Sequence, residues 1–378
     1  MSEGPLAGLR VVEVGGIGPS TFAAMVLSDL GADVIRFDRP GAVGATERDL
    51  DFLVTRGRRS VAVDLRSDAG RDVARALLAT ADVAIEGFRP GVAERLGVGP
   101  ADIPNERLVY ARVTGWGQDG PWTDAPGHDI NYIAVTGALH AIGRSDSPPP
   151  PPLNLIGDYG GGGMLCVVGI LAALHERATS GQGQVIDAAM VDGVALLSTL
   201  FFGTNHLGAI VPERESNNID GGAPWYDTYA CSDGRFISVG GGEPHFFASL
   251  CELFEIEEPF DPFDRAQWPA IRARFAAAIA TRTRDEWAVH AGDPSLCLSP
   301  VLTWDEAPDN VHLRARGTFT VDHGVVQPSP APRLSRTPGR IRRPPPWPGE
   351  HTDEVLRDWA VPRALVDAAG DAVRQRPD

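Results

Sequence analysis

The N-terminal part of the chain alternates short apolar runs with stretches whose apolar positions recur three and four residues apart. Short apolar runs are typical of buried strands, and the second pattern predicts amphipathic helices. The predicted strands are Leu9–Val14, Val34–Asp38, Val61–Leu65 and Val83–Glu86, and the predicted helices are Ser20–Leu30 and Ala69–Ala79. Strands and helices that alternate in this way predict a parallel, Rossmann-like α/β sheet.

The same pattern continues past the middle of the chain. Met164–Leu174 is an apolar run long enough for a buried helix and too short to cross a membrane, so we expect no membrane span. A strand at Gly183–Ala189 and a helix at Val191–Phe202 complete the expected sheet domain. The polar, turn-rich stretch Asn205–Asp220 that follows is predicted to be a linker.

A smaller domain is predicted beyond this linker. Trp225–Cys231 and Arg235–Val239 flank the turn residues Ser232-Asp233-Gly234, which indicates a β-hairpin. Helices are expected at Ala248–Glu255 and Trp268–Ala280.

The C-terminal region is rich in proline and arginine. Pro328–Pro348 is predicted to be an extended linker, Asp353–Trp359 a short docking helix, and the tail after Pro362 poorly ordered. We therefore expect a large domain at 1–204, a linker at 205–220, a small α+β domain at 221–327, and a segment at 328–378 that returns to the large domain.

Composition and charge exclude some classes of function. The net charge of -16 among 378 residues argues against a broad nucleic-acid surface, which needs clustered positive charge. The four cysteines lie far apart without a CxxC pair, so we expect neither a zinc site nor a redox dithiol. Met1–Arg10 lacks the pattern of a signal peptide, and we expect a cytoplasmic protein.

A partial dinucleotide pattern follows the first predicted strand. Gly16-Ile17-Gly18 is followed some twenty positions later by the acidic Asp38, as in nicotinamide-binding folds. The third small position falls on Thr21 and Pro19 stiffens the loop, so the match is incomplete. An NAD-dependent enzyme stays open on this pattern alone.

Two residues able to exchange protons frame the most informative stretch. His128 stands in Gly127-His128-Asp129-Ile130-Asn131-Tyr132, and Asp158 precedes four glycines and the apolar run. Asp is a favoured N-cap, and glycines at a helix start let a ligand approach free N–H groups, so Asp158 could lie beside an oxyanion site. Asp158 could equally be a simple helix cap, and His128 a turn residue.

Three motifs in one order carry a family resemblance. Gly127–Tyr132, then Asn154–Gly162, then Gly221–Tyr226 resemble the family III CoA-transferase superfamily of the CaiB/BaiF type, and within it the α-methylacyl-CoA racemases. The resemblance runs from Gly4 to at least Pro338 and implies an acyl-CoA substrate, no metal or redox cofactor, and an interlocked homodimer.

The resemblance also implies site residues. His128 and Asp158 would exchange the α-proton on opposite faces of the thioester, Glu243 would orient the His128 imidazole, and Asn154 would orient a catalytic group. The Asp158 amide is the expected donor to the enolate oxygen. The residues implied for CoA are Arg39, Val63, Asp64, Leu65, Arg66, Gly87, Phe88, Arg89, Arg95, Gly127, Asp129, Ile130, Asn131 and Tyr132.

Two alternatives accompany these assignments. Other arginines near the predicted strand ends, namely Arg36, Arg56, Arg58 and Arg59, could also contact CoA phosphates or could be surface charges. A CoA-transferase of the same superfamily would use Asp158 as a nucleophile and would cover the intermediate with a glycine-rich loop, for which Gly240-Gly241-Gly242 is the candidate.

Overall fold

The computed structural model describes residues 4–47 and 52–376. The chain divides into two compact units. The first comprises Met1–Thr136, Leu153–Leu197 and Arg316–Asp378, and the second comprises Gly137–Pro152 and Ser198–Ala315. The expected boundaries differ from this division, because the 137–152 loop lies in the second unit, which also begins at Ser198 instead of after a linker. The return to the first unit comes at Arg316, ahead of the expected 328.

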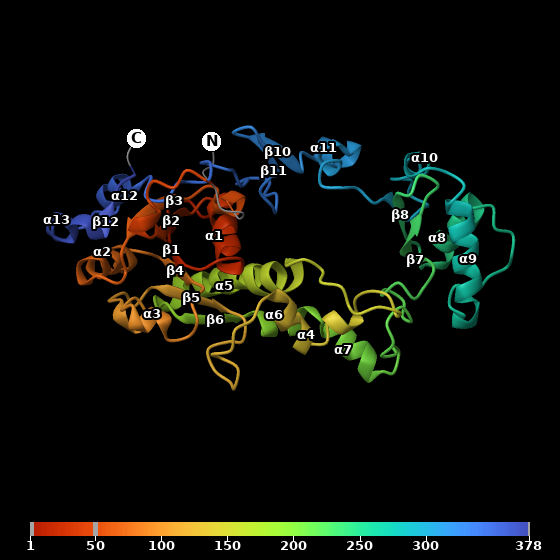
Figure 1. Cartoon of the computed structure of the whole chain (residues 1–378), viewed down its shortest axis with the longest axis horizontal. Coiled ribbons are helices and arrows are strands. Elements are labelled where there is room, and N and C mark those ends of the chain that lie inside the picture. Colours follow the sequence, from red (N-terminus) through yellow and green to blue (C-terminus); the bar gives the residue numbers. More distant parts are fainter. Residues whose placement is uncertain (1–3, 48–51, 377–378) are drawn as a thin grey trace. The chain divides into compact units, whose positions relative to one another are not determined.

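The first unit is built on a seven-stranded sheet with the order β12-β3-β2-β1-β4-β5-β6 (Figure 1). Its strands are β1 (Arg10–Gly15), β2 (Asp33–Asp38), β3 (Arg59–Val63), β4 (Val83–Glu86), β5 (Val109–Thr114), β6 (Val185–Ala189) and β12 (Val373–Arg374). Strands β1 to β6 are parallel, so the predicted parallel sheet is confirmed. The antiparallel β12 makes it a mixed sheet.

Two apolar cores lie on opposite faces of this sheet. Alternate residues of a strand point to opposite faces, and β1 divides accordingly, with Val11 in one core and Val12 and Val14 in the other. The first core is covered by α1 (Pro19–Asp29) and α5 (Leu165–Ser180). The second is covered by α2 (Asp68–Ala79), α3 (Val92–Arg95), α12 (Thr352–Asp358) and α13 (Arg363–Ala369), on the other side of the sheet in Figure 1.

The C-terminal segment is part of this unit, and the expectation of a poorly ordered tail after Pro362 is wrong for the described residues up to Arg376. Val373 and Arg374 pair with β3. Trp359, 2% exposed, donates from Nε1 to Asp33 at 2.9 Å. The stretch predicted as an extended linker contains no helix or strand between 329 and 351, yet the N–H of Arg340 donates to the Asp29 carbonyl at 2.8 Å. Tertiary hydrogen bonds therefore order a region whose composition indicates flexibility.

The remaining helices of the first unit surround the region of His128 and Asp158. They are α4 (Asp129–Val135), a π-helical segment (Leu155–Met164) that continues directly into α5, and α6 (Met190–Leu197). The π-helix and α5 form one helical stretch of 26 residues, which is long and apolar enough to cross a membrane. Core helices of soluble proteins can have the same length and composition, so this is weak evidence for a membrane span. In this unit Cys166, Val167 and Ile170 of α5 are buried on the sheet.

The second unit contains a three-stranded antiparallel sheet in the order β7-β8-β9. The predicted hairpin is confirmed as β7 (Tyr226–Ala230) and β8 (Phe236–Gly240), followed by β9 (Leu298–Pro300). The predicted helix at 191–202 is two helices, α6 and α7 (Thr199–His206). The helices that follow are α8 (Pro244–Leu253), α9 (Trp268–Ile279), α10 (Arg284–Ala288) and α11 (Val311–Arg316). The next two strands, β10 (Phe319–Asp322) and β11 (Val325–Pro328), belong to the first unit.

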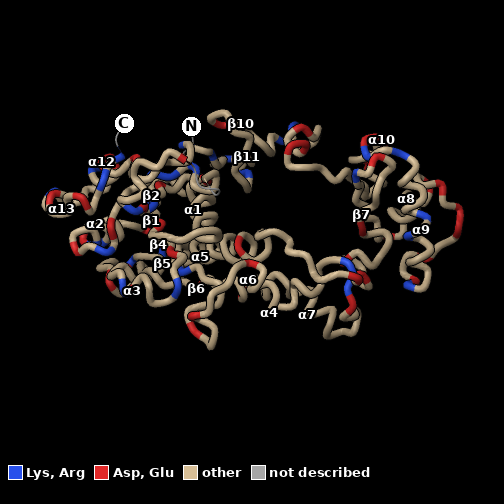
Figure 2. Tube along the Cα trace, in the orientation of Figure 1, with Lys and Arg blue, Asp and Glu red and all other residues tan. Residues whose placement is uncertain are grey.

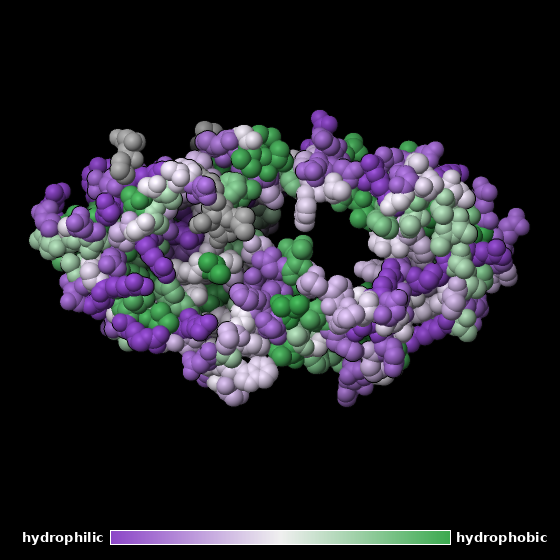
Figure 3. All heavy atoms as spheres, in the orientation of Figure 1, coloured by the Kyte–Doolittle hydropathy of each residue, from purple (hydrophilic) through white to green (hydrophobic). Residues whose placement is uncertain are grey.

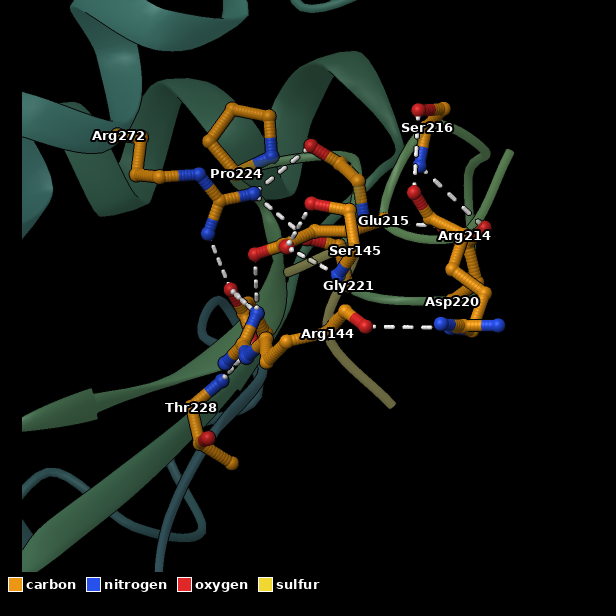
Figure 4. Close-up of polar contacts among 12 residues, drawn as sticks. Arg144, Ser145, Arg214, Glu215, Ser216, Asp220, Gly221, Pro224, Thr228 and Arg272 are labelled. Carbon is orange, nitrogen blue, oxygen red and sulfur yellow. Dashed lines mark hydrogen bonds and ion pairs between the residues drawn. The ribbon is translucent and has the colours of Figure 1, made fainter. Parts of the chain in front are cut away.

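An ion-pair network orders the predicted linker of the second unit (Figure 4). Arg144 contacts Asp227 with both terminal nitrogens, at 3.0 and 2.8 Å, and Glu215 at 2.9 Å. Arg272 also pairs with Asp227 and donates to the carbonyl of Gly221 at 2.6 Å. Leu207–Asp220 has neither helix nor strand, but these contacts hold it against β7 and α9.

Candidate functional site

Asp158 lies in the first turn of the π-helical segment, whose N-cap is Asn154. The prediction that Asp158 caps an α-helix is therefore wrong, because the helical stretch begins at Leu155 and its N-cap lies four residues before Asp158. The side chain of Asn154 donates from Nδ2 to Oδ2 of Asp158 at 3.2 Å. The predicted role of Asn154, to orient a catalytic group or the thioester, stays a prediction.

Asp129 joins the Asp158 turn to the start of α4. Its Oδ2 accepts a hydrogen bond from the main-chain N–H of Asp158 at 2.7 Å, and its side chain is buried. The expectation that this amide is free to bind an enolate oxygen is therefore wrong in this conformation. Asp129 thus has a structural role in this turn, and its predicted contact with CoA stays a prediction.

His128 is the N-cap of α4 and is exposed. Its main-chain N–H donates to Oδ1 of Asn131 at 3.0 Å, so Asn131, another predicted CoA contact, stabilises the helix start. His128 adjoins Asp129 in the sequence, and Asp129 binds Asp158. The fold thus joins the turn that carries Asp158 to the helix start that carries His128, although these two residues are 30 positions apart in the chain.

The electrostatics of Asp158 suit proton exchange. Burial raises the pKa of its half-buried carboxyl; the Asn154 hydrogen bond lowers it, the charge of Asp129 raises it, and His128 lowers it, with a net upward shift. An upward shift brings an aspartic acid closer to the neutral range, where a group can both accept and donate a proton.

The Gly16-Ile17-Gly18 loop lies beside Asp158. A Cβ atom on Gly18 would be 3.2 Å from Oδ2 of Asp158, and Gly18 has a φ of 62°. Asp38, the acidic residue of the partial dinucleotide pattern, is occupied by Ser60 at 2.6 Å and Arg36 at 3.2 Å. Gly18 therefore lies against the Asp158 carboxylate, a position that sequence reasoning missed.

The four glycines after Asp158 allow close helix packing. Cβ atoms would approach Val194 within 3.0 Å from Gly161, and Pro19 and Phe22 within 2.8 Å from Gly162 and Gly163. Close packing against α1 and α6 therefore requires glycine at these positions, with or without a bound ligand.

Most of the predicted CoA residues follow the carboxyl ends of parallel strands. Arg39 follows β2, Val63 ends β3 and is succeeded by Asp64–Arg66, and Gly87–Arg89 follow β4. Ligands of open α/β sheets bind at this edge. Burial raises the pKa of Tyr132, the charge of Asp158 raises it further, and the charge of Arg89 lowers it.

The arginines of this region separate into two groups. Arg58, fully buried, pairs with Glu13 at 2.6 Å; Arg56 pairs with Asp29 at 2.6 Å; and Arg59 pairs with Asp33 at 2.5 Å. Arg36 likewise pairs with Asp38. The hypothesis that these four arginines bind the phosphates of CoA is not supported, because their guanidinium groups already form ion pairs with carboxylates. Arg39, Arg66, Arg89 and Arg95 are exposed, and within the described residues their side chains form no ion pair.

The remaining predicted CoA contacts on and before α4 differ in accessibility. Tyr132 is buried, and its hydroxyl donates to the Gly127 carbonyl. Its ring packs edge-on against Trp116, with centroids 4.8 Å apart. Ile130 is 41% exposed, and Asn131 is exposed as well, so the side chains of these two residues are accessible to a ligand.

Apolar side chains are exposed around the helices that carry Asp158. They are Ile17, Leu155, Met164, Val168, Leu171, Leu196 and Leu197. The trace over α6 is mostly uncharged in Figure 2, and apolar atoms gather over α5 and α6 in Figure 3. Such a grouping is larger than scattered surface apolar residues and indicates a surface that binds an apolar ligand or another protein.

Glu243 lies in the second unit, as the N-cap of α8. It is exposed, makes no side-chain capping bond, and forms no ion pair with another described residue. The Glu243 side chain therefore does not cap α8 through a hydrogen bond. Its pairing with His128 stays a prediction.

Comparison with known proteins agrees with this arrangement. The family model of CoA-transferase family III matches residues 6–352. The α-methylacyl-CoA racemase of Mus musculus is 45% identical over 361 residues, which cover 94% of this chain and 93% of that protein. The α-methylacyl-CoA racemase of Homo sapiens is 42% identical over 368 residues, 96% of this chain and 95% of that protein.

Solved structures agree as well. The crystal structure of a CaiB/BaiF family protein from Brucella suis superposes with a TM-score of 0.82 at 26% identity, covering 94% of this chain and 100% of that chain. The match extends over both the sheet unit and the smaller unit. The chain therefore belongs to CoA-transferase family III.

Proposed function

We propose that this protein is an α-methylacyl-CoA racemase, an isomerase that interconverts (2R)- and (2S)-2-methylacyl-CoA thioesters. The structural observation that supports the proposal is the hydrogen bond from the main-chain N–H of Asp158 to Asp129, the neighbour of His128, together with a pKa of Asp158 that burial raises. The 45% and 42% identities to racemases over nearly the whole chain support the same activity.

The chemistry requires two proton carriers. The α-hydrogen of a thioester is weakly acidic because its loss leaves an enolate, with negative charge on the thioester oxygen. In one direction neutral His128 takes the α-proton, and protonated Asp158 returns a proton to the opposite face of the same carbon. In the reverse direction the Asp158 carboxylate takes the proton and the imidazolium of His128 returns one.

The neighbours of Asp158 prepare it for both roles. Asn154 donates to Oδ2 of the carboxyl, and Asp129 accepts from the main-chain N–H, so the side chain and the backbone of Asp158 each have a hydrogen-bond partner. The enolate oxygen needs a donor other than the Asp158 amide, because Asp129 already accepts from that N–H. Removing such a donor typically costs roughly 2.7 to 4 kcal/mol of transition-state stabilisation.

CoA would lie along the edge formed by the carboxyl ends of β2, β3 and β4. Its phosphates would bind the four exposed arginines Arg39, Arg66, Arg89 and Arg95. Gly87, Phe88 and Asp64–Leu65 would contact the remaining CoA groups through their main chain. The reaction requires neither a metal nor a redox cofactor, and we expect it to take place in the cytoplasm.

The proposed racemase activity can be tested from a single enantiomer of the substrate. One enantiomer of a 2-methylacyl-CoA is incubated in D2O, with deuterium entry followed by NMR and the enantiomer ratio by chiral separation. Racemisation with deuterium entry, lost in His128→Ala and in Asp158→Asn, would support the proposal. An inert α-proton would overturn it.

The same experiment tests the transferase alternative, which membership of the family keeps open. In that reaction the Asp158 carboxylate attacks the thioester carbonyl and expels the CoA thiolate, which leaves an anhydride. The thiolate then attacks the aspartyl carbonyl and releases the donor acid as its carboxylate. The resulting aspartyl-CoA thioester passes CoA to a second free acid by the same steps in reverse, which restores the Asp158 carboxylate. CoA appearing on an added carboxylic acid, with no deuterium entry, would identify this activity.

Glu243 would act across an interlocked homodimer, completing the site of the partner subunit. Co-expression of His128→Ala and Glu243→Ala chains tests this arrangement. Random pairing makes half of the dimers mixed, and each mixed dimer holds one intact site of two, so about a quarter of the wild-type activity is expected. Recovery no greater than that of either parent would contradict action between subunits.

A further inference from the structure

Glu243 is preceded by a glycine that touches a tryptophan ring. A Cβ atom on Gly242 would lie 2.5, 2.7 and 3.1 Å from Cζ3, Cε3 and Cη2 of Trp225. All three atoms belong to the six-membered part of the indole. Trp225 therefore occupies the space of the missing side chain and packs directly on the backbone that leads into Glu243.

The indole is itself fixed in the second unit. Trp225 is 6% exposed, and its Nε1 donates to the Pro262 carbonyl at 3.0 Å. Trp268 donates to the same carbonyl at 2.8 Å and meets the Trp225 ring edge-on, with centroids 6.4 Å apart. A side chain held in this way transmits its position to whatever packs on it.

The neighbouring glycines differ in their surroundings. A Cβ on Gly241 would come within 2.6 Å of Leu250, a fully buried residue of α8. A Cβ on Gly240 would meet only Cys297, at an ordinary 3.9 Å. None of the three glycines has a φ in the left-handed region, so the effect of an alanine substitution should differ among them only through its steric contacts.

We propose that Trp225 is a positioning residue that sets the place of the Glu243 carboxylate through contact with Gly242. The inference rests on the proposed catalytic role of Glu243. It also explains the glycines that suggested a loop over a transferase intermediate: Gly241 and Gly242 are sites of close packing on the small-unit core.

The test compares two substitutions that differ in steric contact. Gly242→Ala forces the Trp225 ring or the loop to move, and Gly240→Ala does not. A displacement of about 1 Å can lower turnover about 100-fold, so we expect kcat of Gly242→Ala to fall by about that factor with KM nearly unchanged. Gly240→Ala should stay within about twofold of the wild type. Adding Trp225→Phe, which removes the part of the indole that the new methyl group would meet, should restore much of the kcat lost in Gly242→Ala.

Four results would overturn the inference. Equal kcat for Gly242→Ala and Gly240→Ala would remove the positional effect. A fall in kcat that Trp225→Phe does not repair, or a melting temperature of Gly242→Ala well below that of the wild type, would make the contact merely structural. Wild-type kcat in Glu243→Gln would remove the role of Glu243, whereas a wild-type chain that racemises nothing in D2O would instead defeat the proposed function itself.

Discussion

The carboxylate of Asp129 accepts a 2.7 Å hydrogen bond from the main-chain N–H of Asp158, across 29 positions of sequence. Because His128 adjoins Asp129, this single bond fixes the turn that carries one proton-exchanging residue to the helix start that carries the other. A Cβ on Gly157 would lie 2.7 Å from the same carboxylate oxygen. The glycine before Asp158 is therefore required by the bond.

Asp129 also acts on Asp158 through its charge. Asp129→Asn keeps an acceptor oxygen and the side-chain shape but removes the negative charge, which is one of the causes, after burial, of the raised pKa of Asp158. We expect the pKa of Asp158 to fall. In the direction where Asp158 is the acid, the alkaline limb of kcat should then move to lower pH, and in the reverse direction the acid limb should move the same way.

The measurement is the pH profile of kcat from each enantiomer. Asp192→Asn is the matched control, because Asp192 is exposed on α6 of the same unit. A profile of Asp129→Asn identical to that of the control would contradict the electrostatic coupling.

Asp158 should destabilise the fold in its ionised form. Its folded pKa is raised, first by burial, so the carboxylate is less favourable in the folded than in the unfolded chain. Stability is fully present below the unfolded pKa of about 4 and is lost as the pH rises through the folded pKa. We expect Asp158→Asn to melt at a higher temperature than the wild type at pH 7. This difference in melting temperature should disappear near pH 4. Thermal melting of both proteins from about pH 4 to pH 7 measures it, and equal melting temperatures at pH 7 would contradict the prediction.

Arg89 should contribute affinity for the phosphates of CoA. Arg89→Ala removes one charge-assisted bond, worth about 1.5 to 3 kcal/mol, so KM for an acyl-CoA should rise about 10- to 100-fold with little change in kcat. A pantetheine thioester that lacks the nucleotide phosphates should show no such difference. Arg363→Ala, an exposed arginine of α13 paired only with Asp367 in the described chain, is the control. An equal KM effect on both thioesters would place Arg89 away from the phosphates.

Arg58 should contribute stability instead of affinity. Its guanidinium is fully buried with Glu13, and removing one partner of a buried pair typically costs about 3 to 5 kcal/mol. Chemical denaturation should show a loss of this size in Arg58→Ala, while the KM of the folded fraction stays unchanged. A raised KM without lost stability would return Arg58 to the group of phosphate ligands.

Local pattern determined much of the fold. The strands β1 to β4 and helices α1 and α2 lie within one or two residues of their predicted positions, because alternation and helical spacing are properties of neighbouring residues. The hairpin around Ser232-Asp233-Gly234 was predictable for the same reason. The chemistry of His128 and Asp158 was visible in their types and in the family resemblance of their motifs.

Contacts between distant positions decided the rest. The sequence could not separate Arg58 from Arg89, since the carboxylate that occupies Arg58 comes from Glu13, 45 positions away. It could not show that Val373 would pair with Val63, or that Asp129 would occupy the Asp158 amide. By itself the sequence determined which residues could form the sheet and exchange protons. Only the tertiary structure decided which charges are neutralised and which stay available, because ion pairs and sheet edges are formed by chain segments that the fold alone brings together.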